Sequence, residues 1–174
     1  GQPRCRHRIE WENLNEYSQN DMKNFDLTGE VAVVIGATGV LGGALAEGLA
    51  EAGAKVAVVG RNAERGQARV KAIEAKGGTA KFYTADAVKI DGLKAVDAVV
   101  TRELGAPTIL VNAAGGNDPK VTVTGDMTFE KIALEDWHAN FDLNLVGGVL
   151  LPCQAFGPGM VARGQGSIIN IASI

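Results

Sequence analysis

The chain reads VAVVIGATGVLG over residues 31–42, an apolar run followed by three glycines that stand three residues apart. The five apolar residues 31–35 predict a strand that is buried on both faces. After the glycines, Leu41, Leu45 and Leu49 recur at every fourth residue, as on one face of a helix. A strand, a GxxGxxG turn and a helix in this order are the setting of a dinucleotide-binding turn.

Each glycine of this turn has an expected role. Gly36 allows the tight turn, Gly39 lets the backbone approach a pyrophosphate, and Gly42 lets the helix pack on the strand. Thr38 and Leu41 lie in the same turn, where backbone N–H groups and the helix dipole would hold the anion. The alternative is that these glycines only tighten a strand-to-helix connection. The buried strand before them and the alternating elements after them favour nucleotide binding.

Strands and helices continue to alternate along the chain. Strands are predicted at residues 56–59, 80–84, 108–111 and 167–171, and helices at residues 62–75, 90–104 and 135–163. This alternation predicts a doubly wound parallel α/β sheet with helices on both faces, a Rossmann fold that ends after its fifth strand. Pro152 and the cluster at 157–159 should bend or break the last helix. The irregular stretch 116–134 follows a strand's carboxyl end, where we expect substrate contacts.

Composition limits the domain organisation and the partners. Residues 1–24 are polar and aperiodic and are predicted to be an arm, whereas residues 25–174 form the nucleotide-binding domain, expected to be incomplete at its C-terminus. The net charge of −3 disfavours nucleic acid and membrane surfaces. Two cysteines without metal-ligand spacing indicate a cytoplasmic protein with no metal site. We expect neither a membrane span nor secretion, and a small molecule is the expected partner.

The end of the second strand selects between the two nicotinamide cofactors. An acidic residue there binds the ribose 2′-hydroxyl of NAD, whereas a positive residue accommodates the 2′-phosphate of NADP. Here the strand runs into Gly60-Arg61-Asn62, with no carboxylate. Asn62 is expected to contact the cofactor, and it can also cap the helix that follows. Arg61 can pair with a phosphate through two hydrogen bonds, so NADP(H) is favoured and NAD(H) is possible. The alternative is that Arg61 is only a solvated surface charge.

Further motifs stand at matching points of the alternating pattern. Asp86 follows the third strand, Asn112-Ala113-Ala114-Gly115 ends the fourth, and Asn144 lies in the last helical stretch. With the segment at 166–173, these residues resemble the short-chain dehydrogenase/reductase family in order and spacing. Residues 36–62 look most like the sugar-acid oxidoreductases that interconvert mannonate and fructuronate.

The resemblance implies a role for each matching residue. Asp86 and the adjoining Ala87 would receive the adenine, while Asn112, Ala113, Ala114 and Gly115 would support the central strand and line the nicotinamide side. Asn144 would hold a proton-relay water, and Ser173 would hydrogen-bond the substrate's carbonyl or hydroxyl. Such donors suit hydride transfer, because reduction of a ketone builds negative charge on oxygen. The resemblance also implies a homo-oligomer, a dimer or a tetramer.

Two departures from the family pattern keep alternatives open. Ile35 and Val40 replace a threonine and a glycine of the usual TGxxxGxG turn, and the resulting GxxGxxG resembles the extended, epimerase-like branch. The residues at 112–115 and around Asn144 instead resemble the ordinary oxidoreductase branch. The family's catalytic YxxxK would fall after Ile174, because neither Tyr17 nor Tyr83 begins such a motif. The chain alone is therefore expected to be inactive, or to serve as a noncatalytic nucleotide-binding module.

Overall fold

Five parallel strands form one sheet in the computed structural model, which describes residues 25–172. The strands are β1 (Val31–Ile35), β2 (Lys55–Gly60), β3 (Thr79–Thr84), β4 (Ile109–Asn112) and β5 (Ser167–Asn170). They lie in the order β3-β2-β1-β4-β5, and every neighbouring pair is parallel. Each strand predicted from an apolar run is present, and β1 has the predicted bounds. The predicted arm at residues 1–24 lies outside the described residues.

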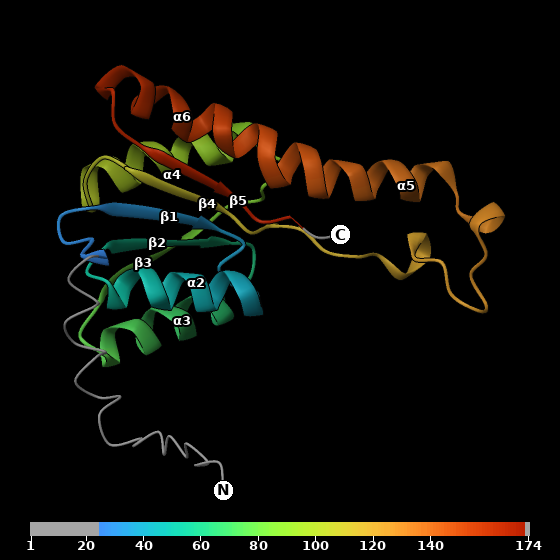
Figure 1. The fold of residues 1–174 in the computed structure, drawn as a ribbon, viewed down its shortest axis with the longest axis horizontal. Helices are drawn as coiled ribbons and strands as arrows, with labels where there is room; N and C mark the ends of the chain where they lie inside the picture. The colour runs from blue at the N-terminus through green and yellow to red at the C-terminus, as the bar shows by residue number, and fades with distance from the viewer. Residues whose placement is uncertain (1–24, 173–174) are drawn as a thin grey trace, which may run out of the picture.

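Helices cover both faces of the sheet, as the doubly wound fold requires. Figure 1 shows one layer formed by α2 (Val40–Glu51) and α3 (Ala63–Ala75), and an opposite layer formed by α4 (Ile90–Glu103) and α6 (Leu151–Arg163). The chain winds outward from β1 to β3 and then crosses back to β4 on the other side of β1. The strand order therefore reverses between β1 and β4, which is where open α/β sheets bind ligands.

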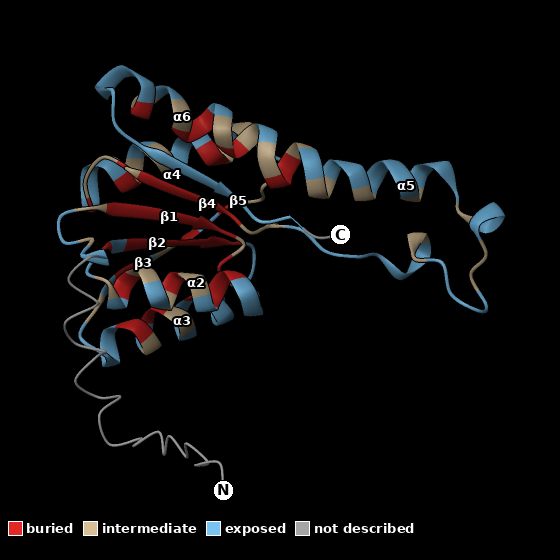
Figure 2. Cartoon of the chain, in the orientation of Figure 1, coloured by how far each residue is buried: buried red, intermediate tan, exposed pale blue. Residues whose placement is uncertain are grey.

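The core has two halves that share β1. Val33 and Ile35 belong to the cluster under α4 and α6, which includes Leu93 and Phe156. Ala32 and Val34 belong to the cluster under α2 and α3. Successive side chains of a strand point to opposite faces, so an unbroken apolar run is what a strand between two helical layers needs. Figure 2 shows the central strands as the most buried part of the molecule.

The helical stretch before β5 is continuous, so the predicted break is wrong. α5 (Leu134–Phe141), a π-helical segment η5 (Asp142–Leu150) and α6 form one rod (Figure 1). Pro152 lies in the first turn of α6, directly after the wider π-helical turns, and Pro158 lies inside α6. Proline removes one hydrogen-bond donor, and packing of Phe156 and Met160 in the core keeps the rod helical despite that loss.

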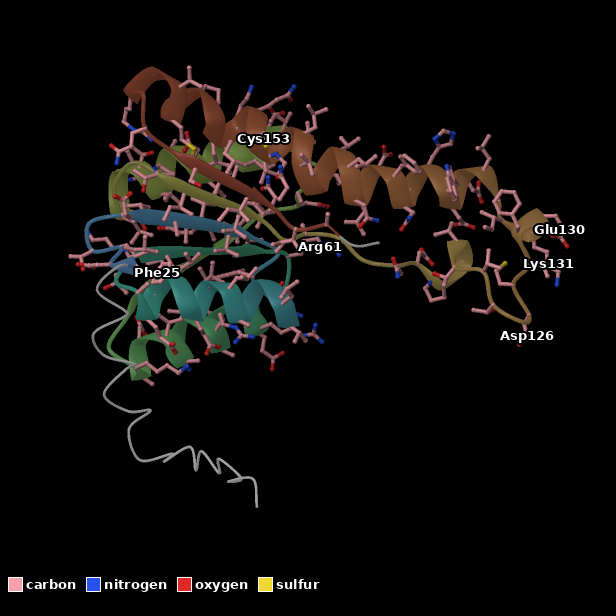
Figure 3. The ribbon with its side chains drawn as sticks, viewed as in Figure 1. Phe25, Arg61, Asp126, Glu130, Lys131 and Cys153 are labelled. Carbon is pink, nitrogen blue, oxygen red and sulfur yellow. The ribbon has the colours of Figure 1, made fainter. Side chains whose placement is uncertain are left out.

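The predicted irregular stretch runs away from the sheet beside α5 (Figure 1). It contains two short 3-10 turns, η3 (Pro119–Val121) and η4 (Phe129–Lys131), and Lys120 anchors it to α5 through an ion pair of 3.0 Å with Asp136. Figure 3 labels Asp126, Glu130 and Lys131 at its far tip, where the Lys131 ammonium donates to the Asp126 carbonyl at 3.0 Å. Whether this stretch contacts substrate stays a prediction.

By length and composition alone, the rod Leu134–Arg163 could cross a membrane, since its most apolar 18-residue window has a mean hydropathy of 1.5. The core helix of a globular domain can pass the same test. Phe156 and Met160 of this rod are buried against the sheet, which favours the core-helix interpretation.

Candidate functional site

The glycine-rich turn and the start of the loop after β4 meet at the reversal of strand order. Gly36 directly follows β1 with φ of +85°, and a Cβ on this residue would lie 2.7 Å from both the Ala113 oxygen and the Ala114 nitrogen. Only glycine fits this left-handed and crowded position without strain. Gly42 is equally constrained, because its Cβ would contact the Gly36 carbonyl. The turn thus packs against the residues predicted to line the nicotinamide side.

The N-terminus of α2 has its backbone donors available. Gly39 is the N-cap and supplies no side-chain hydrogen bond, and the first turn contains no acidic residue. Val40 and Leu41 are 90% and 56% exposed, so no side chain of the core shields this end. Unpaired N–H groups and the positive end of the helix dipole favour an anion here. This geometry fits the pyrophosphate of a dinucleotide.

Arg61 and Asn62 both follow β2, but only the Asn62 side chain forms a hydrogen bond within the described part of the domain. Arg61 is exposed at the carboxyl-end edge of the sheet (Figure 3), and no ion pair is found for it among residues 25–172. The Asn62 Oδ1 atom instead accepts the backbone N–H of Arg65 at 2.9 Å and caps α3. The sequence predicted both a helix cap and a cofactor contact for Asn62, and its side chain is engaged in the cap.

Asp86 and Ala87 form a turn directly after β3. The Asp86 Oδ1 atom accepts the backbone N–H of Val88 at 3.2 Å, which fixes the carboxylate over its own turn. The π-helical segment η5 packs closely on this turn, because a Cβ on Gly147 would lie 3.1 Å from the backbone of Ala87 and of Val88. Contact of Asp86 with an adenine ring stays a prediction.

Asn112 joins β4 to its neighbours from a buried position. Its side chain is only 1% exposed, and Nδ2 donates to the Asn170 Oδ1 atom on β5 at 2.8 Å and to the Cys153 Sγ atom on α6 at 3.5 Å. Figure 3 places Cys153 above the sheet on α6. These hydrogen bonds tie β4 to β5 and to α6, and a role of Asn112 at the nicotinamide side stays a prediction. The Asn112 Oδ1 atom has no hydrogen-bond partner within the described part of the chain.

Asn144 lies in η5 and holds the loop that follows β4. Its Oδ1 atom accepts the backbone N–H of Gly116 at 2.9 Å, and its Nδ2 atom donates to the Gly116 carbonyl at 3.0 Å. The same Nδ2 atom also lies 2.8 Å from the Asn140 carbonyl and 3.1 Å from the Asn140 Oδ1 atom. An amide nitrogen has two hydrogens, so three acceptors exceed what it can satisfy at once. The Nδ2 atom can therefore lose one of these acceptors and still have a partner for each of its two hydrogens.

Sequence reasoning missed the residues that seat η5 against the site. A Cβ on Gly148 would lie 2.9 Å from the Ala114 carbonyl, so this glycine and Gly147 allow the helix to approach the loops after β4 and β3. Two adjacent glycines in an apolar helical stretch were the available signal. Asn170 was also missed, since no local pattern connects it with Asn112. Ser173, the predicted substrate-binding serine, lies outside the described residues.

Tyr83, the tyrosine within the described chain, has a structural role. Its hydroxyl donates to Glu103 at 3.1 Å, and burial together with this hydrogen bond raises the pKa of Tyr83 above its ordinary value. A raised pKa makes the phenol a weaker acid, so Tyr83 does not suit proton exchange at neutral pH.

Known proteins share this arrangement. An uncharacterized oxidoreductase from Bacillus subtilis is 36% identical over 159 residues, covering 86% of this chain and 56% of that protein. The structure of a proposed D-mannonate oxidoreductase from Haemophilus influenzae with bound NAD has a TM-score of 0.79 and 32% identity, covering 88% of this chain and 58% of that one. A gluconate 5-dehydrogenase from Burkholderia cenocepacia, in complex with NADP and tartrate, has a TM-score of 0.71 and 34% identity, covering 88% and 57%.

The chain therefore spans somewhat more than half the length of these relatives. The family profile described as short chain dehydrogenase matches residues 30–174, which include every site residue discussed above. Together with the glycine-rich turn at the strand reversal, this match shows that the chain belongs to the short-chain dehydrogenase family.

Proposed function

We propose that this chain is the cofactor-binding part of an NADP(H)-preferring oxidoreductase that transfers hydride between the nicotinamide and a small polar carbonyl compound or secondary alcohol. The observation that carries this proposal is the uncapped N-terminus of α2, which follows the tight turn that Gly36 and Gly42 allow. The dinucleotide, when bound, supplies the hydride.

Support for the phosphate-bearing cofactor comes from the end of β2. Arg61 is exposed there, whereas the acidic residue that would repel a 2′-phosphate is absent. The solved relatives hold NAD in one case and NADP in another, so the choice depends on this chain's own residues.

The chain's other site residues would orient the reactants. Asn144 holds Gly116, and through it the loop after β4, in one position relative to η5. Release of Asn140 would free an Asn144 hydrogen to bind a water or a substrate oxygen. Ser173, by family resemblance, would stabilise negative charge on the substrate oxygen.

A sugar acid is the proposed substrate class. A gluconate 5-dehydrogenase and a proposed D-mannonate oxidoreductase are among the relatives, and both names refer to polyhydroxy acids. Relatives that are named oxidoreductases or dehydrogenases favour this chemistry over an epimerase-like reaction.

The protein is proposed to work as a homo-oligomer in the cytoplasm. Large apolar side chains lie exposed at helical spacing along α5 and η5, namely Leu134, Trp137, Phe141 and Leu145. Such a stripe is typical of a surface that pairs with another subunit.

Calorimetric titration of the chain with NADPH and NADH tests this proposal. NADPH should bind at least roughly tenfold more tightly, because one charge-assisted hydrogen bond contributes about 1.5–3 kcal/mol. The Arg61→Met variant should reduce this difference in affinity. The matched control is Arg102→Met, which removes an exposed arginine from α4.

Each result of the titration has a defined meaning. Equal affinity of the wild-type chain for both cofactors would contradict the NADP(H) preference. Failure to bind either dinucleotide would contradict the oxidoreductase proposal itself. For the substrate class, saturation-transfer NMR of the NADP⁺-loaded chain should detect D-gluconate but not 1-hexanol, and the reverse result would rule out a sugar acid.

A further inference from the structure

A groove lies between helices α2 and α3, beside the glycine-rich turn. Its volume is about 460 Å³, and its lining includes Thr38 and Gly39 from the turn and Arg65 and Arg69 from α3. The Thr38 side chain also reaches the end of β2, since a Cβ on Gly60 would lie 2.7 Å from the Thr38 hydroxyl oxygen. The groove thus adjoins the position where β2 runs into Arg61.

The two arginines that line the groove differ in their partners. Arg69 forms an ion pair with Glu47 on α2, and Glu47 also binds Lys76 at 2.9 Å, so the charge of Arg69 is compensated within the protein. No ion pair or side-chain hydrogen bond is found for the Arg65 guanidinium within residues 25–172. Its backbone N–H is taken by Asn62, which fixes the start of its helix but leaves the side chain free.

The charges around the groove add up in favour of an anion. The first turn of α2 contributes no acidic residue, and the first turn of α3 contributes only Glu64. Against Glu64 stand the exposed arginines at 61 and 65 and the positive ends of both helices. A guanidinium suits a phosphate because it offers two parallel N–H donors, and Thr38 has a hydroxyl donor available on the opposite side of the groove.

We infer that Arg65 is a second arginine for the cofactor phosphate: together with Thr38 it binds the 2′-phosphate on the adenosine ribose of NADP(H). This inference rests on the proposed function and adds a specificity-determining residue to it. Arg61 approaches the phosphate from the end of β2, and Arg65 approaches it from the first turn of α3. The pair would explain how a chain with net charge −3 prefers the more negative of two dinucleotides.

Fragments of the cofactor test the inference, because they differ only in the phosphate at issue. The chain is titrated by calorimetry with 2′,5′-ADP and with 5′-AMP, and inorganic phosphate serves as a separate probe for nonspecific anion binding. Arg65→Met should weaken binding of 2′,5′-ADP by roughly tenfold to a hundredfold, the worth of a charge-assisted hydrogen bond, and leave 5′-AMP within about twofold. Arg65→Lys should recover part of the loss. The control is Lys71→Met, which removes the same charge from α3 outside the groove.

The outcomes separate this inference from the proposed function. A selective loss in Arg65→Met that Lys71→Met does not share supports the inference. Equal losses of affinity for 2′,5′-ADP in the two variants would overturn it, because the effect would then come from the overall positive charge. No loss in either variant would also overturn it. If Arg61→Met weakens binding of 2′,5′-ADP but Arg65→Met leaves it unchanged, the inference fails while the proposed NADP(H) preference stands. If the wild-type chain binds neither nucleotide, both fail.

Discussion

Substitution of Gly36 by alanine measures how closely the glycine-rich turn approaches the loop after β4. The left-handed backbone, at φ +85°, costs a residue with a Cβ about 1–2 kcal/mol. The new Cβ would also lie 2.7 Å from two backbone atoms, and such overpacking costs roughly a further 1–3 kcal/mol. The expected loss is thus about 2–5 kcal/mol, or a Tm lower by roughly 4–20 °C for a domain of this size.

Gly77 provides a matched control for this experiment. Its φ of +83° is nearly that of Gly36, but no atom lies within 4 Å of the position that its Cβ would take. Gly77→Ala should therefore show the backbone cost alone, about 1–2 kcal/mol, and keep nucleotide binding. Urea unfolding and calorimetric titration with NADPH are measured on both variants. Equal loss of stability in the two, with binding retained in Gly36→Ala, would refute the close approach.

Three further predictions concern the interior and the seat of η5. Gly148→Ala places a Cβ 2.9 Å from the Ala114 carbonyl, which should lower the free energy of unfolding by about 1–3 kcal/mol and weaken NADPH binding. Unchanged affinity for NADPH in a titration would contradict the role of Gly148 in positioning η5. Asn112→Leu should lower the free energy of unfolding by only about 1 kcal/mol, because the exposed Asn170 can hydrogen-bond to water instead. Asn112→Asp buries a charge and should lower it by about 3 kcal/mol or more at pH 7, so similar urea midpoints for the two variants would contradict this prediction. Burial raises the pKa of Asp97 above its ordinary 3.8, so ionisation of Asp97 destabilises the fold as pH rises through the raised pKa. Asp97→Asn should therefore be more stable than the wild type at pH 7, by less than about 1 kcal/mol, and should lose this gain below pH 3.8. A gain in stability that does not depend on pH would exclude this explanation.

The sheet could be predicted from the sequence because strands buried on both faces appear as unbroken apolar runs. A strand between two helical layers needs apolar side chains at every position, and residues 31–35 meet that need without interruption. The helical stretch from α5 to α6 was also predicted, at residues 135–163, but its continuity could not be predicted from local chemistry. Pro152 and Pro158 predict a break from local chemistry, but packing of Phe156 and Met160 on the sheet outweighs it.

In the candidate site, too, features with local spacing could be predicted, whereas those that depend on contacts between distant segments could not. The glycines at 36, 39 and 42 act through local spacing, so their role was readable from the sequence. The partner of Asn112 lies 58 residues away on another strand, and the groove beside Arg65 exists only because α2 and α3 pack side by side. A surface arginine in the first turn of a helix carries no signal of such a neighbour.

The helical segment η5 contacts two loops at once. Asn144 and Gly148 both meet the loop after β4, while Gly147 meets the turn after β3. Residues four apart lie on one face of a helix, whereas adjacent residues point in different directions. Sliding η5 by a single residue would therefore break the hydrogen bonds of Asn144 and press a side chain against both loops. The position of Asn144 thus depends also on two glycines that make no hydrogen bond to it, so a larger side chain at 147 or 148 should displace Asn144 from Gly116.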